Sequence, residues 1–205
     1  ALSVVGLFAN TPLADAIAAG TLVLLLDLSD VDARPFAVAV HQGRLAPDDS
    51  GCNVQTERCS YEVQRAGLDA ATCAPVVQLG ATLTDDTIRA GGPGTVFPLT
   101  LPIGAASLTL TLYDVRLDAT LARRDDVVVG LSGVLGGAVS KAALRPALLA
   151  LPPGALPIEP TAVASLLDRL VTNDIDTDGD GTPDAASIGL RVEGIGATLT
   201  RVVTP

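Results

Sequence analysis

The sequence of 205 residues contains no Trp and no Met, a single His and a single Lys. Aromatic residues make up 2% of the chain although 48% of it is hydrophobic, so its core must be built from Leu, Val, Ala and Ile. Basic residues are also scarce, because 13 of them face 23 acidic residues and the formal net charge is −10. An acidic chain without a basic cluster argues against electrostatic docking on nucleic acid or on anionic lipid. We expect neither of them as a partner.

A long hydrophobic run that could cross a membrane is also missing. The longest stretch without a charge covers residues 90–113. Pro93, Pro98 and Pro102 interrupt it, and its tail alternates with a period of two, whereas a membrane helix needs about 20 apolar residues in an unbroken run. We therefore expect no transmembrane segment.

The cysteines point to a compartment. The segment 46–75 holds Cys52, Cys59 and Cys73 without a CxxC spacing, and the single His41 lies outside it. This pattern fits an exported protein with one disulfide and one remaining thiol better than a cytosolic metal or redox site. The spacing leaves two pairings open, Cys52–Cys59 and Cys59–Cys73. We expect the protein outside the cell or at the cell surface, with the periplasm as the alternative.

Hydrophobic patterns predict a mainly β protein with a few helices. Apolar or alternating segments indicate strands at residues 21–28, 35–43, 76–84, 95–101, 107–121, 127–135, 187–192 and 195–203. Helical spacing, with Pro at a start or Gly at an end, indicates helices at residues 11–20, 140–151 and 160–171, and one helical turn at 2–9. The expected class is α+β, an antiparallel β-sandwich or sheet with short helices packed on one side. No long linker divides residues 1–205, so we expect a single domain, with residues 46–75 as a loop.

The segment 107–121 alternates most clearly but changes its phase. Leu108 and Leu112 share one parity, whereas Val115 and Leu117 share the other, so a regular strand cannot bury both pairs on one face. A bulge or turn near Tyr113–Asp114 would restore the register. We expect such an irregularity there.

An acidic motif, "DIDTDGDGTPD", occupies residues 174–184 and contains the pattern D-x-D-x-D-G. Alternating carboxylates, a glycine for the sharp turn and a later carbonyl are the ligand pattern of a calcium loop, and hard oxygen ligands suit Ca²⁺. The expected ligands are Asp176, Asp178, Asp180, the backbone carbonyl of Thr182, and Asp184.

The closing acid of such a loop is missing, because Ser187 occupies its place. Asp174 is our first choice for that ligand. The loop leads from a helix into a strand, whereas a calcium sensor needs a helix on both sides in order to open. The motif therefore predicts a structural Ca²⁺ at residues 174–187.

Two resemblances accompany these patterns. The stretch "DTDGDGTPD" resembles the calcium loops of thrombospondin type 3 repeats, and this likeness implies Asp176, Asp178, Asp180 and Asp184 as ligands. Longer stretches resemble an uncharacterised family of exported bacterial lipoproteins, which implies placement in the envelope or at the surface. They are "NTPLADAIAAGTLVLLLDL", "DAATCAPVVQL", "AGGPGTVFPLTLPIG", "LSGVLGGAVSK" and "DIDTDGDGTPDAASIGLR".

No catalytic motif is complete. "GLSG" at residues 130–133 falls short of a nucleophile elbow, a single His41 is more often structural than catalytic, and no Trp accompanies the glutamates that a glycosidase would use. We expect a non-enzymatic, calcium-stabilised structural or self-assembling surface protein, such as a filament, coat or matrix subunit. The alternative is a surface or periplasmic binding module. Self-association would cover apolar surface in so hydrophobic a chain.

Overall fold

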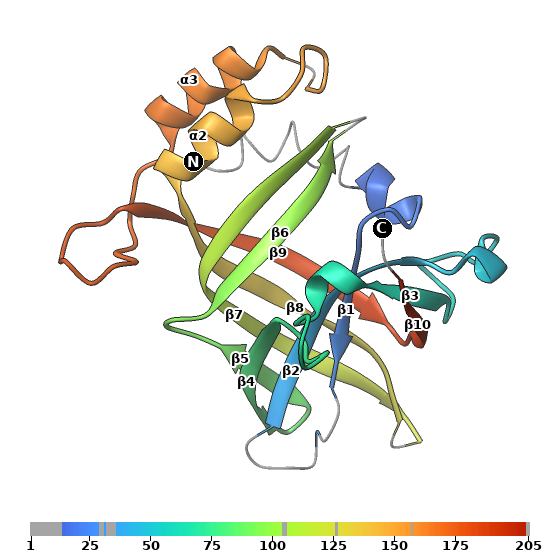
Figure 1. Cartoon of the computed structure of the whole chain (residues 1–205). Coiled ribbons are helices and arrows are strands. Elements are labelled where there is room, and N and C mark those ends of the chain that lie inside the picture. The colour runs from blue at the N-terminus through green and yellow to red at the C-terminus, as the bar shows by residue number, and fades with distance from the viewer. Residues whose placement is uncertain are drawn as a thin grey trace. The chain divides into compact units, whose positions relative to one another are not determined.

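A computed structural model describes residues 14–28, 31, 36–103, 106–125, 127–156 and 158–203, and most of them lie in strands (Figure 1). The strands are β1 (Val23–Asp27), β2 (Phe36–Leu45), β3 (Ser60–Gln64), β4 (Val77–Thr84), β5 (Thr87–Gly91), β6 (Val96–Ile103), β7 (Ala106–Arg124), β8 (Val127–Ser140), β9 (Ala185–Ile195) and β10 (Thr198–Val203). The helices are α2 (Lys141–Leu149) and α3 (Pro160–Leu170), and residues 14–18 are also helical. The predicted mainly β, α+β class is confirmed.

The strands form one sheet in the order β10-β3-β2-β4-β5-β7-β8-β9, with β1 added to β2 and β6 added to β7. The sheet is mixed, because β10 runs parallel to β3 while the registered pairs β1–β2, β2–β3, β2–β4, β4–β5, β5–β7 and β6–β7 are antiparallel. The strands at the two ends of this order, β9 and β10, follow each other in the chain after only two residues.

Contacts group the chain into two compact units. The first contains the described residues of segments 1–16, 93–115 and 136–189, and the second contains those of 17–92, 116–135 and 190–205. The sequence did not predict this division, and the single-domain expectation stays a prediction. No helix in the described parts of the chain combines the length and the apolar character that crossing a membrane requires.

The first unit has its own apolar core around α2 and α3. Val163 and Leu167 of α3 are buried together with Leu148 of α2 and with Ile103 and Leu108 of the β6–β7 pair. Helix α3 begins at Pro160 after Glu159, so Thr161 lies inside the helix and does not cap it, although its place in the sequence would favour a cap. Of the apolar residues at helical spacing in 160–171, Val163, Leu167 and Val171 are buried, whereas Leu170 is 37% exposed.

In the second unit, the core between the strands is aliphatic, as the shortage of aromatic residues requires. Its largest fully buried apolar side chains include Leu79, Ile88 and Leu117, from three neighbouring strands. A further cluster joins Leu25 to Cys59, Tyr61 and Val63.

The predicted irregularity in the long strand is confirmed. Asp114 has a φ of 51°, a left-handed conformation that interrupts regular β geometry. Leu108 and Leu112 are buried before it, and Val115 and Leu117 after it. Strand β7 pairs with β6 up to Tyr113 and with β5 from Arg116 onward, so each half has its own partner.

Three sequence expectations need correction or fall outside the description. Residues 46–75 are not all loop, because β3 lies among them between β2 and β10. Strand β5 was missed, because its five residues lie between turn-forming residues. The helix expected at 11–20 is described only from residue 14, where helical residues run to 18 and Gly20 follows with a φ of 65°. The turn expected at 2–9 lies outside the described residues.

The cysteines form one disulfide and leave one thiol, as expected. Cys52 is bonded to Cys59, so the shorter of the two open pairings is the correct one, and Cys73 is free and exposed. The disulfide joins the two sides of the loop that leads into β3.

Strands β7 and β8 lie so close together that position 133 has no room for a side chain, and this can be tested. A Cβ atom there would lie 2.5 Å from the Cα atom of Ala119, whereas a Cβ atom on Gly80 of β4 would meet nothing within 4 Å. We expect Gly133→Ala to lower the free energy of unfolding by about 1–3 kcal/mol, the usual cost of overpacking. Gly80→Ala, the matched control, should stay within about 0.5 kcal/mol. Urea unfolding measures both, and equal stability of the two variants would contradict the close contact.

Candidate metal centre

The acidic loop lies in the first unit, between α3 and β9, and its two ends are fastened to each other. Ile175 and Ala185 form an isolated antiparallel bridge in which each backbone N–H donates to the other's carbonyl at 3.0 Å. The N–H of Asp184 also donates to the carbonyl of Ile175 at 2.9 Å. Residues 176–184 are therefore a closed loop, visible as the projecting loop before β9 in Figure 1.

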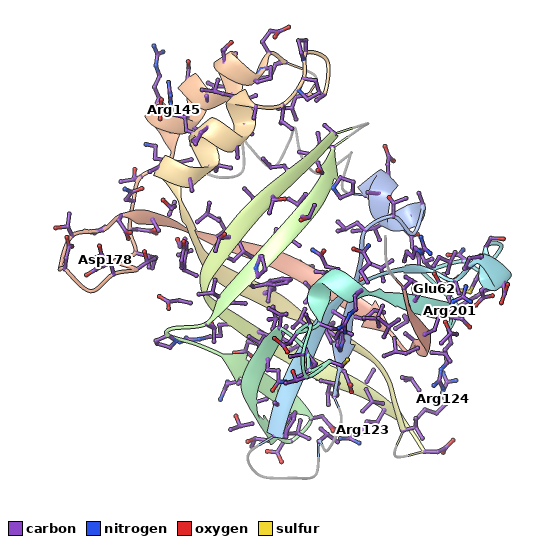
Figure 2. The ribbon with its side chains drawn as sticks, in the orientation of Figure 1. Glu62, Arg123, Arg124, Arg145, Asp178 and Arg201 are labelled. Atoms are coloured by element: carbon purple, nitrogen blue, oxygen red, sulfur yellow. A yellow bond between two sulfur atoms is a disulfide. The ribbon has the colours of Figure 1, made fainter. Side chains whose placement is uncertain are left out.

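Three of the predicted ligands come together in this loop. Asp176, Asp178 and Asp180 each offer a carboxylate oxygen, and these oxygens lie within 4.8 Å of one another. Asp178 and Asp180 are exposed and Asp176 is half-buried; Figure 2 shows Asp178 inside the loop. Two oxygens at that separation can share a Ca²⁺, whose oxygen ligands lie at about 2.3–2.6 Å.

The same carboxylates also fold the loop. Asp176 accepts hydrogen bonds from the N–H groups of Gly179 and Gly181, both at 2.7 Å, and these bonds, Gly181 first, hold its pKa below the usual value. Asp178 accepts from the N–H of Asp180 at 3.1 Å, and Asp180 accepts from that of Thr182 at 2.7 Å. Gly179 and Gly181 have φ values of 79° and 88°, which glycine adopts without strain.

Asp184, another predicted ligand, is oriented by Thr177. Its Oδ1 accepts from the N–H of Thr177 at 2.8 Å, and the Thr177 hydroxyl donates to its Oδ2 at 2.7 Å. These bonds hold the pKa of Asp184 below its ordinary value. Asp184 therefore lies outside the group of three, although a carboxylate keeps further lone pairs for an ion.

Asp174, the expected closing ligand, binds the start of β9 instead. Its Oδ1 accepts from the N–H of Ser187 and its Oδ2 from the Ser187 hydroxyl, both at 2.6 Å, and these bonds lower its pKa. The structure does not bring Asp174 into the group of three. The sequence marks Ser187 only as the position of a missing acid, because no local pattern pairs residues that are 13 positions apart. The backbone N–H of Thr182 is bonded to Asp180, and its carbonyl faces no partner that the structure describes.

A second polar cluster, which the sequence did not reveal, lies in the second unit. Glu62 of β3 is the only buried acid among the described residues, with 1% of its side chain exposed. Arg44 of β2 donates to its Oε2 at 2.8 Å, and Arg201 of β10 donates to its Oε1 at 2.6 Å. The hydrogen bond from Arg44 contributes most to lowering the pKa of Glu62, and Arg201 adds to it, although burial acts in the opposite direction.

Other candidate sites lack the parts that their chemistry needs. The sulfur atoms of Cys52 and Cys59 lie near Asp49, but they are joined to each other and cannot bind a metal as thiolates. His41 lies in β2 opposite Leu25, and burial lowers its pKa. Its Nδ1 has no hydrogen-bond partner among the described residues, so it lacks the orienting group of a catalytic base.

Comparison with known proteins gives no relative. No family model matches the chain, and no curated protein and no solved structure matches it either.

Acid should loosen this loop, because its carboxylates act as hydrogen-bond acceptors. Asp174, Asp176 and Asp184 have pKa values below those of an unfolded chain, so their contribution to stability is present above about pH 4 and is lost as the pH falls through the lowered values. We expect the free energy of unfolding in urea, with chelator present, to decrease between pH 5 and pH 2. Asp174→Asn should decrease less steeply than the unchanged chain, whereas Asp85→Asn, outside the loop, should follow it. Parallel pH dependences for all three chains would show that the hydrogen bonds accepted by Asp174 do not stabilise the fold.

Proposed function

We propose that this chain is an exported, non-enzymatic structural protein, braced by a calcium ion in the loop 174–187, that associates with copies of itself at the cell surface. The observation that carries the proposal is the convergence of Asp176, Asp178 and Asp180 within a closed loop. Three carboxylates within 4.8 Å repel one another, and a divalent cation among them turns this repulsion into attraction.

The donor set favours calcium over other metals. It consists of carboxylate oxygens, with the Thr182 carbonyl and Asp184 near enough in sequence to complete a shell of oxygens. Neither His nor thiolate belongs to it, so the soft or nitrogen-seeking metals find no preferred ligand there. Asp174 would then fasten the bound loop to β9 from outside the shell.

A bracing ion fits the position of the loop. The loop follows α3 and leads directly into β9, and Ile175 and Ala185 already hold its ends. An ion would fix the curved part between them. Nothing in this arrangement provides two helices that could open, so the ion stabilises the fold instead of switching it.

Export and association have separate support. The Cys52–Cys59 disulfide is of the kind that persists in oxidising compartments. Large apolar side chains remain exposed on the last strands of the second unit, and they include Val127, Val134, Leu190, Leu199 and Val202. Contact with a second copy would remove such side chains from water.

Calcium binding is tested by titration calorimetry and by melting with and without chelator. At free Ca²⁺ of 100 times the dissociation constant, mass action adds roughly 2.7 kcal/mol, which corresponds to a melting shift of roughly 5–10 °C for a chain of this size. Asp178→Ala should remove both the binding heat and the shift, yet leave the oligomeric state unchanged, because the ion braces only the loop.

Asp174→Ala provides the matched control for this experiment. It breaks the bonds to Ser187 but leaves the group of three intact. We expect it to lower the melting temperature while preserving the calcium-dependent shift. A chain that binds no Ca²⁺ at millimolar concentration, or that melts identically with chelator, would show that the proposal is wrong.

A binding module is the second candidate, and one hollow favours it. The hollow measures about 420 Å³ and lies over β4, β5 and β7, where Gly80 and Gly91 leave space beside Arg89 and Arg116. Asp118 also lines the hollow and pairs with Arg89, so Arg116 is the side chain that would suit an anionic group on a small ligand. Stabilisation by an acidic small molecule in a thermal-shift screen, lost in Arg116→Ala and kept in Arg169→Ala, would favour this function. A screen without any such ligand would leave the structural role as the better account.

A further inference from the structure

Strand β10 is held to its neighbour without burying a single side chain. Its residues are exposed or, at Val203, half-buried, and Leu199 and Val202 are 47% and 51% exposed. What binds it to β3 is the parallel backbone pairing from Thr198 to Val203, a hydrogen bond from the Thr200 hydroxyl to the carbonyl of Tyr61, and the ion pair of Arg201 with Glu62. A strand held in this way opens at lower cost than one that also buries apolar side chains.

The pairing of β10 contains an irregularity that selects one side chain. Leu199 is opposite Tyr61, but the register then shifts so that Arg201, and not Thr200, is opposite Glu62. A bulge of this kind re-aims a side chain. Here it brings the guanidinium of Arg201 onto Glu62, with its Nη2 atom 2.5 Å and its Nε atom 2.6 Å from Oε1 (Figure 2).

The edge of β3 therefore needs a second cationic partner for Glu62. Glu62 is buried, and without β10 it would keep Arg44 as its only cationic partner in the described chain. A buried carboxylate that loses a partner is costly, so this edge favours a strand that carries an arginine at the bulged position. The required charge is found on β10 of every copy of the chain.

The connection to β10 permits the strand to change partners. Gly196 and Ala197 link β9 to β10, and the sheet order places β9 beside β8 and β10 beside β3, so β10 does not fold back on β9 as a hairpin. The N–H of Gly196 is bonded to the carbonyl of Val129, which fixes the chain up to that residue, and Ala197 packs against the cluster of Leu25, Cys59, Tyr61 and Val63. A rotation at Gly196 and Ala197 that releases Ala197 from this cluster redirects β10 and leaves β9 in place.

We propose that β10 exchanges between copies, so that β10 of one chain adds parallel to β3 of a second copy and its Arg201 pairs with the Glu62 of that copy. The contacts are those of the single chain, so the exchange needs no new surface, and it is reciprocal between two copies. The inference rests on the proposed self-association and names the segment that performs it. Leu199 and Val202 would then lie at the junction of two copies.

Two chains that keep the Cys52–Cys59 disulfide and carry one free cysteine each test the exchange directly. Gln64 of β3 and Val203 of β10 are opposite each other in the register, so Cα atoms at these positions lie within reach of a disulfide. Both chains carry Cys73→Ser; one carries Gln64→Cys and the other Val203→Cys, with tags of different mass. They are co-expressed, purified together and oxidised mildly in Ca²⁺, and their cross-links are separated on a denaturing gel without reductant.

We expect a disulfide between the two differently tagged chains as the main cross-linked product. The control replaces Val203→Cys by Val127→Cys, an exposed position in β8 that is not opposite Gln64 in any registered pair. Arg201→Ala in the Val203→Cys chain should remove the cross-link, because the buried Glu62 then gains nothing from the incoming strand. Arg191→Ala, in the neighbouring β9, should leave it unchanged.

A mixed cross-link no stronger than that of the Val127→Cys control would overturn the exchange. Light scattering of the unaltered chain in Ca²⁺ separates this failure from that of the proposed function. Oligomers without the mixed cross-link would mean that copies associate through another surface. A monomer without the cross-link would remove both self-association and exchange, while the calcium titration would still decide the bracing role of the loop.

Discussion

A buried carboxylate must be paired with a cation, and the pairing of Glu62 with Arg201 helps to hold the end strand of this sheet, β10, on β3. The residue lies in β3 with an arginine from the strand on each side, so that β2, β3 and β10 are joined by one carboxylate. Strand β10 contributes no buried apolar side chain of its own, and the attraction between Arg201 and Glu62 therefore carries much of its specificity. The register of β10 shifts between Leu199 and Arg201, and this bulge interrupts the regular pairing but places the arginine opposite Glu62.

Carboxylates perform a different task in the first unit. There Asp174, Asp176 and Asp184 accept hydrogen bonds from backbone N–H groups and from hydroxyls, and each bond fixes a part of the loop. These acceptors remain close to water, so the cost of assembling negative charge is moderate and the loop keeps its form through local bonds. The same geometry brings the oxygens of Asp176, Asp178 and Asp180 together, which is why the proposal of a calcium ion concerns this loop and not Glu62, whose oxygens are already occupied by guanidinium groups.

Features that depend on neighbouring residues could be predicted from the sequence. The change of parity in β7 indicated the irregularity that the structure has at Asp114, and helix α3 follows from the spacing of Val163 and Leu167. The three converging aspartates follow from their alternation and from the glycines between them. The role of Asp174 could not be predicted, because its partner Ser187 is fixed only by the bridge between Ile175 and Ala185.

Features that depend on segments far apart in the sequence could not be predicted, because their partners lie outside any local pattern. Strand β3 is five residues long and has a glutamate at its centre, so its sequence alone suggests a polar loop. It becomes a buried strand because β2 and β10 bring arginines to both sides of Glu62, and β10 lies 139 residues further along the chain. A pattern search within a short window cannot detect such a compensation.

The shortage of lysine also fits a chain whose cations pair with carboxylates of other segments. Arg44, Arg89, Arg123, Arg145 and Arg201 each pair with a carboxylate of another segment of the chain. A guanidinium is planar, stays charged when it is partly buried and can direct two N–H groups at one partner, as Arg201 does at Glu62. Lys141, the single lysine, donates instead to the carbonyls of Asp168 and Val171 at the end of α3, where a compact charge suits the negative end of a helix. Arginine is therefore the residue that joins separate segments of this chain, strands at Arg44 and Arg201 and helices at Arg145. A lysine at position 201 would carry the charge without the geometry that fits β10 to β3.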